Sequence, residues 1–232
     1  MDECGRLKRM TRRMTVLALA VLVVPALAAA FPGPASCALL GLAPLDGEDV
    51  RFERSLSADQ RRAALVVLSA ARERLSTRLG LSSSRVHVIF LGDGRSLWPF
   101  SFNDYGSTHF FGPRACMVIG QEGRNVDVVA HELTHAALFE RLGAWNRERL
   151  PTWFDEGLAM QVDDRERYQG APVDRAVREL RRPGLFFVEP LTEHYASARA
   201  LVTAWRAQLT VSEWAGVLTR LSDGEALDQV WP

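Results

Sequence analysis

The pattern of apolar and polar positions predicts one helix and two strands in the first half of the chain. Ser57 and Gln60 form a capping-box pattern, leucines then recur at helical spacing, and Gly80 marks the end of the helix. Runs of β-branched and other apolar residues predict strands over 86–91 and 115–120. The first half therefore combines a helix with a small sheet.

Helical patterns dominate the second half of the chain. A helix is predicted from Asn125, a residue type that caps helices, to about Leu142. After Pro151 the pattern is helical throughout, with candidate helices over 153–163, 172–182, 192–208, 211–221 and 224–231. We therefore predict an α+β fold in which a small N-terminal sheet is followed by an all-helical half.

Two stretches have no helical period. Residues 31–54 are rich in proline and glycine and show neither a helical nor a strand period, so they are predicted to form a connector. Residues 95–114 are aromatic and rich in turns, which usually indicates core packing. The alternative is a loop and an edge strand that pair with an extended peptide, a common mode of peptide binding. His109 in this stretch and His87 in the preceding strand have no spacing that indicates a role.

The first thirty residues have the pattern of a targeting segment. Residues 1–13 carry five basic side chains, and residues 14–30 contain no charge and end in small residues spaced as in a cleavage site. The segment is either a signal peptide that is removed or a signal anchor that is retained. Its uncharged run of 17 residues is at the short limit for a membrane span and contains Pro25. In both cases we expect the rest of the chain to be exported, to a periplasmic or extracellular location.

Composition narrows the class of protein. The chain has 232 residues, 47% of them hydrophobic, which suffices for one globular domain, predicted over 55–232. The 28 basic and 28 acidic residues give a formal net charge of zero, so no overall field favours nucleic acid as a partner. Beyond the targeting segment the cysteines are Cys37 and Cys116, which either pair in an oxidising compartment or remain buried thiols.

The sequence H-E-L-T-H occupies positions 131–135, within the helix predicted from Asn125. His131 and His135 are four residues apart and lie about 40° apart on one helix face, so both imidazoles can bind one Zn²⁺. Glu132 follows the first ligand, and its carboxylate can act as general base on a zinc-bound water without being a ligand. Burying these side chains would be costly without a metal or hydrogen bonds.

A catalytic zinc site needs a third protein ligand and one open position. No third histidine follows in the metzincin pattern, and the next candidate segment is P-T-W-F-D-E-G-L-A at 151–159. There the chain resembles gluzincin zinc metallopeptidases, the class of thermolysin and aminopeptidase N, and is most similar to their minimal peptidase MA-like domain. The resemblance implies that Glu156 of W-x-x-E-G is the third ligand. Asp155 is the rival by proximity, but it has the position of an ordinary acid in the first turn of a helix.

The resemblance covers roughly residues 85–230 and also concerns Tyr195. A tyrosine before a similar helix stabilises the tetrahedral oxyanion in aminopeptidase N, which implies that role for Tyr195, with simple packing as the alternative and His194 as the substitute candidate. The G-x-M-E-N segment that aminopeptidases use to hold the substrate amine is absent, which favours an endopeptidase. Met160 stands where thermolysin has an acid four residues after its glutamate ligand, so the sequence names no hydrogen-bond partner for His131.

These observations predict an exported zinc metallopeptidase with a thermolysin-like zincin catalytic domain, acting on a peptide or protein substrate. His131, His135 and Glu156 are expected to hold Zn²⁺, with Glu132 as general base and Tyr195 as oxyanion donor. The rival prediction is a zinc-binding envelope protein, catalytically restricted or inactive, that acts as an interaction module. Glu132 separates the two, because a structural zinc site needs no adjacent base and is usually closed by four protein ligands.

Overall fold

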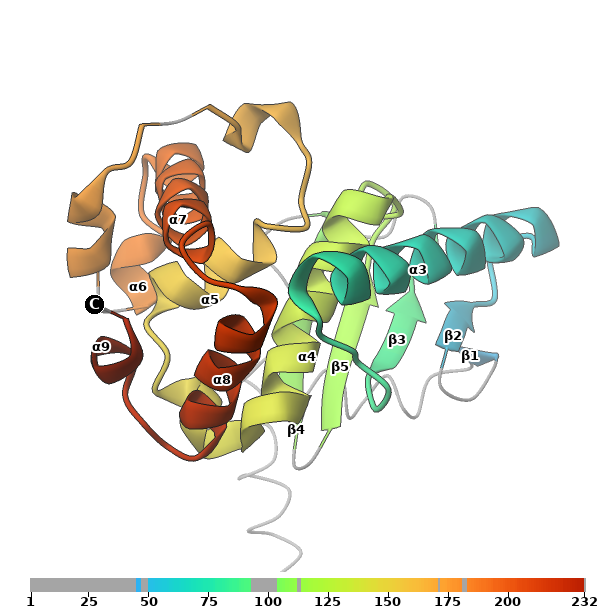
Figure 1. Ribbon diagram of the computed structural model, residues 1–232. Helices are drawn as coiled ribbons and strands as arrows, with labels where there is room; N and C mark the ends of the chain where they lie inside the picture. The colour runs from blue at the N-terminus through green and yellow to red at the C-terminus, as the bar shows by residue number, and fades with distance from the viewer. Residues whose placement is uncertain are drawn as a thin grey trace, which may run out of the picture.

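The computed structural model describes residues 45–46, 50–92, 104–111, 114–170, 172–180 and 183–231. Over these residues the chain is a mixed α+β protein, as predicted. The sheet and two long helices form one side of the molecule, and the later helices gather on the other side (Figure 1). None of the helices among the described residues is long and apolar enough to cross a membrane, and the predicted targeting segment 1–30 lies outside those residues.

The sheet has five strands among the described residues, in the order β1-β2-β3-β5-β4. They are β1 (Leu45–Asp46), β2 (Val50–Glu53), β3 (His87–Phe90), β4 (Gly106–Phe111) and β5 (Arg114–Ile119). β2, β3 and β5 run parallel, whereas β1 and β4 pair antiparallel at the two ends of the sheet. β3 and β5 confirm the two predicted strands.

Two of the other three strands correct the sequence analysis, and the third bears on the two alternatives for the aromatic stretch. β1 and β2 lie within 31–54, so the prediction of a connector without strands is wrong there; strands this short show no clear period of two. β4 lies within the aromatic stretch 95–114 and, among the described strands, pairs with β5 alone, so it forms an edge of the sheet as described. This confirms a strand at residues 106–111, whereas its pairing with a peptide stays a prediction and residues 95–103 lie outside the described residues.

α3 (Ala58–Leu79) confirms the first predicted helix. The Ser57 hydroxyl accepts a hydrogen bond from the Gln60 N–H at 3.2 Å, and the Ser57 N–H donates to the Gln60 side chain at 2.8 Å, which completes the capping box. Gly80 ends the helix with a φ of 64°, a left-handed conformation that glycine adopts without strain. The buried face of α3 packs against α4.

α4 (Val126–Glu148) carries the H-E-x-x-H sequence and packs against α3, β4 and β5. The Asn125 side chain caps its N-terminus by accepting a hydrogen bond from the Val128 N–H at 3.0 Å. Gly143 interrupts the helix with a φ of 75° and a ψ of 165°, so the regular part ends at Leu142, as predicted. Every residue from Val128 to Phe139 is buried, which makes this helix the centre of the core.

The helical half follows Pro151. It comprises α5 (Thr152–Ala159), the 3-10 helices η1 (Glu166–Tyr168) and η2 (Arg175–Glu179), α6 (Pro183–Phe186), α7 (Leu191–Arg206), α8 (Val211–Ser222) and α9 (Leu227–Val230). α5, α7, α8 and α9 confirm four of the predicted helices. The prediction of a helix over 172–182 is wrong, because the described residues of this range, 172–180, form only η2. Asp174 caps its first turn, and Leu180 already leaves the helical region with a ψ of 57°.

Aromatic side chains hold α5 in place. Trp205 of α7 stacks on Trp231 with ring centroids 4.2 Å apart. Trp153 and Phe154 of α5 meet the Trp231 ring edge to face at 5.2 and 6.0 Å. Each such pair contributes roughly 0.5–1.5 kcal/mol beyond the burial of its surface. The tryptophan of the W-x-x-E-G segment therefore anchors the helix that carries Glu156.

The glycine of the same segment allows α5 and α7 to approach closely. A Cβ at Gly157 would lie 2.7 Å from the Ala198 carbonyl oxygen and 2.7 Å from Cγ2 of Val202. Real Cβ atoms essentially never come this close to another atom, so a larger residue would push α7 away. Gly157 thus sets the distance between the helix of Glu156 and the helix of Tyr195.

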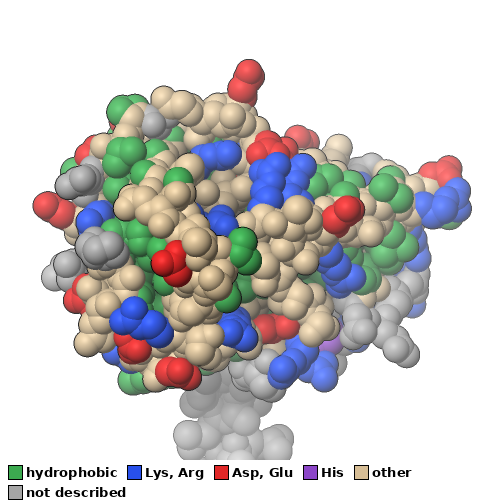
Figure 2. Space-filling model, in the orientation of Figure 1, with side chains coloured by type: hydrophobic (Ala, Val, Ile, Leu, Met, Phe, Trp, Pro, Cys, Tyr) green, Lys and Arg blue, Asp and Glu red, His purple; other side chains and the backbone are tan. Residues whose placement is uncertain are grey.

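Basic and acidic side chains intermingle on the face of the molecule shown in Figure 2. Some of them join distant segments. Arg78 of α3 binds the Asp164 carboxylate through both terminal nitrogens, at 2.7 and 2.8 Å, and Arg74 of α3 donates to the Asp127 carboxylate at 2.5 Å. The first contact fixes the segment after α5 against α3, and the second joins α3 to α4.

Cys116 lies on β5, opposite His87 of β3, and is disulfide-bonded. The alternative of a free buried thiol is therefore wrong for Cys116. Cys37 lies outside the described residues, so its pairing with Cys116 stays a prediction.

Candidate metal centre

The two histidines of α4 point toward a common centre. His131 and His135 are both buried, and their Nε2 atoms lie 3.3 Å apart. The helix places them one turn apart on the same face, as the spacing predicts. Their rings meet at 75°, so the two Nε2 atoms converge without the rings stacking.

Glu156 of α5 brings a carboxylate oxygen to the same centre. Its Oε2 lies 3.2 Å from Nε2 of His131 and 3.6 Å from Nε2 of His135. Three ligands arranged tetrahedrally at zinc-ligand distances would be about 3.3–3.4 Å from one another, which matches this triangle. The three side chains form a buried group that can hold a metal ion.

The Glu156 carboxylate has the properties of a metal ligand. Its Oε2 is buried and makes no hydrogen bond of good geometry, an arrangement that is costly without a partner. Burial raises the pKa of Glu156, but His135 and His131 lower it more, so the pKa lies well below its ordinary value. The carboxylate is therefore ionised at neutral pH and faces two imidazole nitrogens.

Asp155 orients His135 from the other side of the ring. Nδ1 of His135 donates to the Asp155 carboxylate at 3.1 Å, and Arg147 donates to the second oxygen of that carboxylate at 2.5 Å. Asp155 is buried, so it is not the ordinary helix-start acid that its position suggests. Nor does it belong to the group of converging ligand atoms. Its hydrogen bond turns Nε2 of His135 toward Glu156.

Asp163 lies behind the other histidine. Its Oδ2 is 3.7 Å from Nδ1 of His131, a nitrogen that is buried without a hydrogen-bond partner. Asp163 is completely buried, and Arg165 binds both of its oxygens. The sequence analysis missed this residue, because it lies in the loop after α5, where helical spacing offers no guide. The only indication of its role in the sequence is that an acidic residue follows shortly after the helix that carries Glu156.

The Glu132 side chain extends from α4 to the edge strand β4. The Thr108 hydroxyl of β4 donates to Oε2 of Glu132 at 2.8 Å and lies 3.0 Å from the Glu132 carbonyl oxygen. Gly106 leaves room for the glutamate, since a Cβ there would lie 3.2 Å from Cγ of Glu132. Glu132 is thus held by the edge strand and does not belong to the group of three converging ligands. Nothing in the spacing of the sequence indicates Thr108.

Tyr195 of α7 lies beside the centre, with its ring centroid 6.1 Å from that of His131. Burial, and then the carboxylates of Glu156 and Glu132, raise the pKa of Tyr195 well above its ordinary value. The hydroxyl therefore stays protonated at neutral pH and can donate a hydrogen bond. Nδ1 of the substitute candidate His194 instead binds the carbonyl oxygen of Phe186 at 2.9 Å, so that side chain is directed toward α6.

The two histidines of the sheet are engaged elsewhere. Nε2 of His109 lies 2.9 Å from the Ser107 hydroxyl on the edge strand. Nε2 of His87 lies 2.9 Å from the Arg114 guanidinium across β3 and β5. Neither belongs to the buried group of three.

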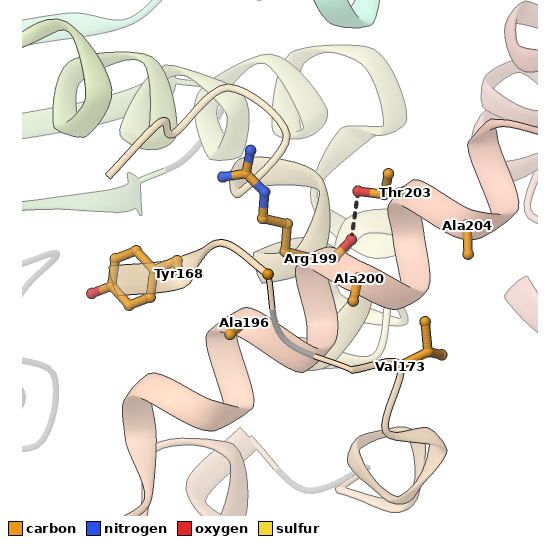
Figure 3. A pocket seen from close by; sticks show the side chains of 8 residues that line it. Tyr168, Val173, Ala196, Arg199, Ala200, Thr203 and Ala204 are labelled. Atoms are coloured by element: carbon orange, nitrogen blue, oxygen red, sulfur yellow. Dashed lines mark hydrogen bonds between the residues drawn. The ribbon is translucent and has the colours of Figure 1, made fainter. Parts of the chain in front are cut away.

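A hollow of about 360 Å³ lies along α7 (Figure 3). Its floor consists of small residues one helical turn apart, Ala196, Ala200 and Ala204, and its wall includes Tyr168. The Tyr168 ring also lies 5.6 Å from the Tyr195 ring. Tyr168 therefore lines the hollow and lies beside Tyr195, whose ring in turn lies near that of His131.

Comparison with known protein families, with curated proteins and with solved structures finds no match for this chain. The function has to be argued from the geometry of the site and from the sequence motifs that form it.

Proposed function

We propose that this protein is a zinc metallopeptidase of the gluzincin type, with a thermolysin-like catalytic domain, and that it acts as an endopeptidase. The observation that carries the proposal is the triangle of His131, His135 and Glu156, whose ligand atoms lie 3.2–3.6 Å apart. Three protein ligands of this kind leave one coordination position open, which is typical of catalytic rather than structural zinc sites.

The surrounding side chains suit peptide hydrolysis. A zinc ion, when bound, supplies Lewis-acid polarisation of a carbonyl group and acidifies water. Glu132 takes the proton of the attacking water and delivers it to the leaving amine. Tyr195 donates a hydrogen bond to the oxyanion, and its raised pKa keeps the hydroxyl protonated. Among the described residues β4 pairs with β5 only, so its other edge, on the strand that carries Thr108, can offer backbone groups to an extended peptide.

We also propose that the protein is exported. Support comes from the basic and then apolar pattern of residues 1–30 and from the disulfide at Cys116, since disulfides form and persist in oxidising compartments.

Metal analysis and a peptide-library digest test the proposal together. The purified protein is expected to hold about one zinc ion and to cleave peptides, and a chelator is expected to abolish cleavage, which added zinc restores. Glu132→Gln is expected to keep zinc and lose cleavage, because the amide cannot accept the proton. Cleavage that persists in this variant would contradict the role of Glu132. Bound zinc with no cleavage of any peptide would favour the interaction module.

A further inference from the structure

Two arginines and two tyrosines form a cluster beside the metal centre. The Arg165 guanidinium lies 5.6 Å from the Tyr105 ring and 5.0 Å from the Tyr168 ring. The Arg167 guanidinium lies 5.4 Å from the Tyr105 ring and 4.7 Å from the Tyr168 ring. We call these four residues the Tyr–Arg cluster.

The cluster is joined to the metal centre in two ways. Arg165 binds Asp163, which lies 3.7 Å from His131. The Tyr168 ring lies 5.6 Å from the Tyr195 ring, which in turn lies 6.1 Å from the His131 ring. A peptide at the metal centre would therefore extend over this cluster within a few residues.

The two arginines differ in their charge partners. Both oxygens of Asp163 bind the Arg165 guanidinium, so the charge of Arg165 is compensated. Arg167 is exposed, and its only interactions with the described residues are with the two tyrosine rings. Contact with ring faces holds a guanidinium in place and leaves its N–H edge free for a planar acceptor. Arg167 is thus a positioned cation without an anionic partner in the part of the chain that the structure describes.

The edge strand relates Arg167 to the reacting bond. Tyr105 directly precedes β4 and is fixed there, because its carbonyl oxygen accepts a hydrogen bond from the Gly120 N–H at 2.9 Å. Thr108, three residues further along, binds the proposed base Glu132. At 3.2–3.4 Å per residue, the two positions are about 10 Å apart along the strand. A peptide paired with β4 would reach Arg167 about three residues from the peptide bond that is cleaved beside Glu132.

We propose that Arg167 is a specificity residue that binds a carboxylate of the peptide substrate about three residues from the cleaved bond. The inference rests on the proposed peptidase function and names its substrate class, peptides with a carboxylate at that distance. The C-terminal carboxylate and the side chain of an aspartate or glutamate both supply this chemistry. Arg165 and the two tyrosines hold Arg167 in position.

Three matched peptides test the inference. They share one neutral sequence that the library digest shows to be cleaved, and end in a free carboxylate, in an amide, or in an amide with a glutamate three residues from the bond. The wild-type protein is expected to prefer a carboxylate-bearing peptide over the neutral amide by about tenfold or more in kcat/KM, in line with a charge-assisted hydrogen bond. The two carboxylate peptides show which source is used.

Arg167→Gln is expected to reduce this preference to about one. Arg178→Gln is the matched control, because among the described residues Arg178 also contacts only aromatic rings, those of Trp153 and Trp231 at 5.8 and 5.4 Å. These rings do not belong to the Tyr–Arg cluster. The control is expected to keep the wild-type preference. No preference in the wild type, or the same preference in Arg167→Gln, would overturn the inference and leave the peptidase function standing.

A binding measurement separates the inference from the proposed function. Zinc-loaded Glu132→Gln protein, with and without Arg167→Gln, is titrated by calorimetry with the neutral peptide as acid and as amide. If no peptide is ever cleaved, a decamer of alanine and serine residues serves as this pair. Tighter binding of a carboxylate peptide that depends on Arg167 supports the inference even when turnover is absent. Equal binding of all forms overturns it.

Discussion

Gly157 of α5 faces Ala198 of α7 so closely that a Cβ at position 157 would lie 2.7 Å from the Ala198 carbonyl oxygen. The contact brings together the helix that carries a proposed ligand and the helix that carries Tyr195. Because backbone stands opposite, the neighbour cannot move aside as a flexible side chain would.

Gly157→Ala is therefore expected to lower the free energy of unfolding by about 1–3 kcal/mol, the usual cost of overpacking. Urea unfolding measures this. Gly216→Ala in α8 is the control, since a Cβ there meets nothing within 4 Å, and it is expected to stabilise the protein by about 0.5–1 kcal/mol through helix propensity. Equal stability of Gly157→Ala and the wild type would refute the close approach.

Zinc is expected to stabilise the fold. A ligand that binds only the folded state at a hundred times its Kd adds about 2.7 kcal/mol, so saturating zinc should raise Tm and a chelator should reverse the rise. His131→Ala should lose this response, whereas His194→Ala, whose ring is directed toward α6, should retain it. Calorimetric melting with and without zinc distinguishes the cases. A zinc response that survives His131→Ala would place the ion elsewhere.

Asp155→Asn is expected to weaken zinc binding about 10–100-fold, because the carboxylate that holds Nδ1 of His135 is lost. Asp163→Asn is expected to have a smaller effect, since its oxygen lies 3.7 Å from His131. The control is Asp164→Asn, which weakens ion pairs with Arg78, Arg74 and Arg199 but removes no histidine contact. Competition with a chromophoric chelator gives the three affinities. If Asp155→Asn and Asp164→Asn bind zinc alike, the orienting role of Asp155 is wrong.

The pH dependence of metal-free and zinc-bound protein is expected to run in opposite directions. Burial lowers the pKa of His135, but Asp155 and Glu156 raise it more, and the net shift is well upward. The stability that this shift provides to metal-free protein is complete below the ordinary histidine pKa and is lost as pH rises through the raised pKa. Zinc must displace that proton, so its affinity should fall about tenfold per pH unit below the raised pKa.

Zinc titrations and metal-free melts between pH 5 and about 9 check these two trends. In His135→Gln, which has no titrating ring at this position, the metal-free protein should lose this component of its pH dependence. Zinc affinity independent of pH over the range would show that His135 does not bind the ion as a neutral imidazole.

Local signals in the sequence predicted the elements that carry the ligands. Capping residues such as Ser57 and Asn125 and a helical spacing of apolar residues are properties of neighbouring positions, so they fix helix boundaries without tertiary information. The spacing of His131 and His135 likewise follows from helix geometry alone. The prediction that Glu156 joins the same centre depended on the family resemblance of the W-x-x-E-G segment. In the structure the Glu156 carboxylate does lie beside the two histidines.

The supporting side chains could not be predicted in this way. Asp163 reaches His131, and Thr108 reaches Glu132, only because a loop and an edge strand fold back on α4. Such contacts join residues that are far apart in the sequence and leave no periodic trace. The sequence does not identify β4 clearly, because the aromatic pattern of this stretch is compatible with core packing as well as with a strand.

The break at Gly143 has a consequence for the electrostatics of the ligands. In an uninterrupted helix, twelve residues separate Arg147 from His135 by about 18 Å along the axis, too far for any shared partner. The left-handed φ of Gly143 redirects the chain, and Arg147 returns to share the Asp155 carboxylate with His135. A single backbone torsion thereby adjusts how much negative charge stands behind one imidazole, and with it how strongly that ring can donate electrons to a bound cation.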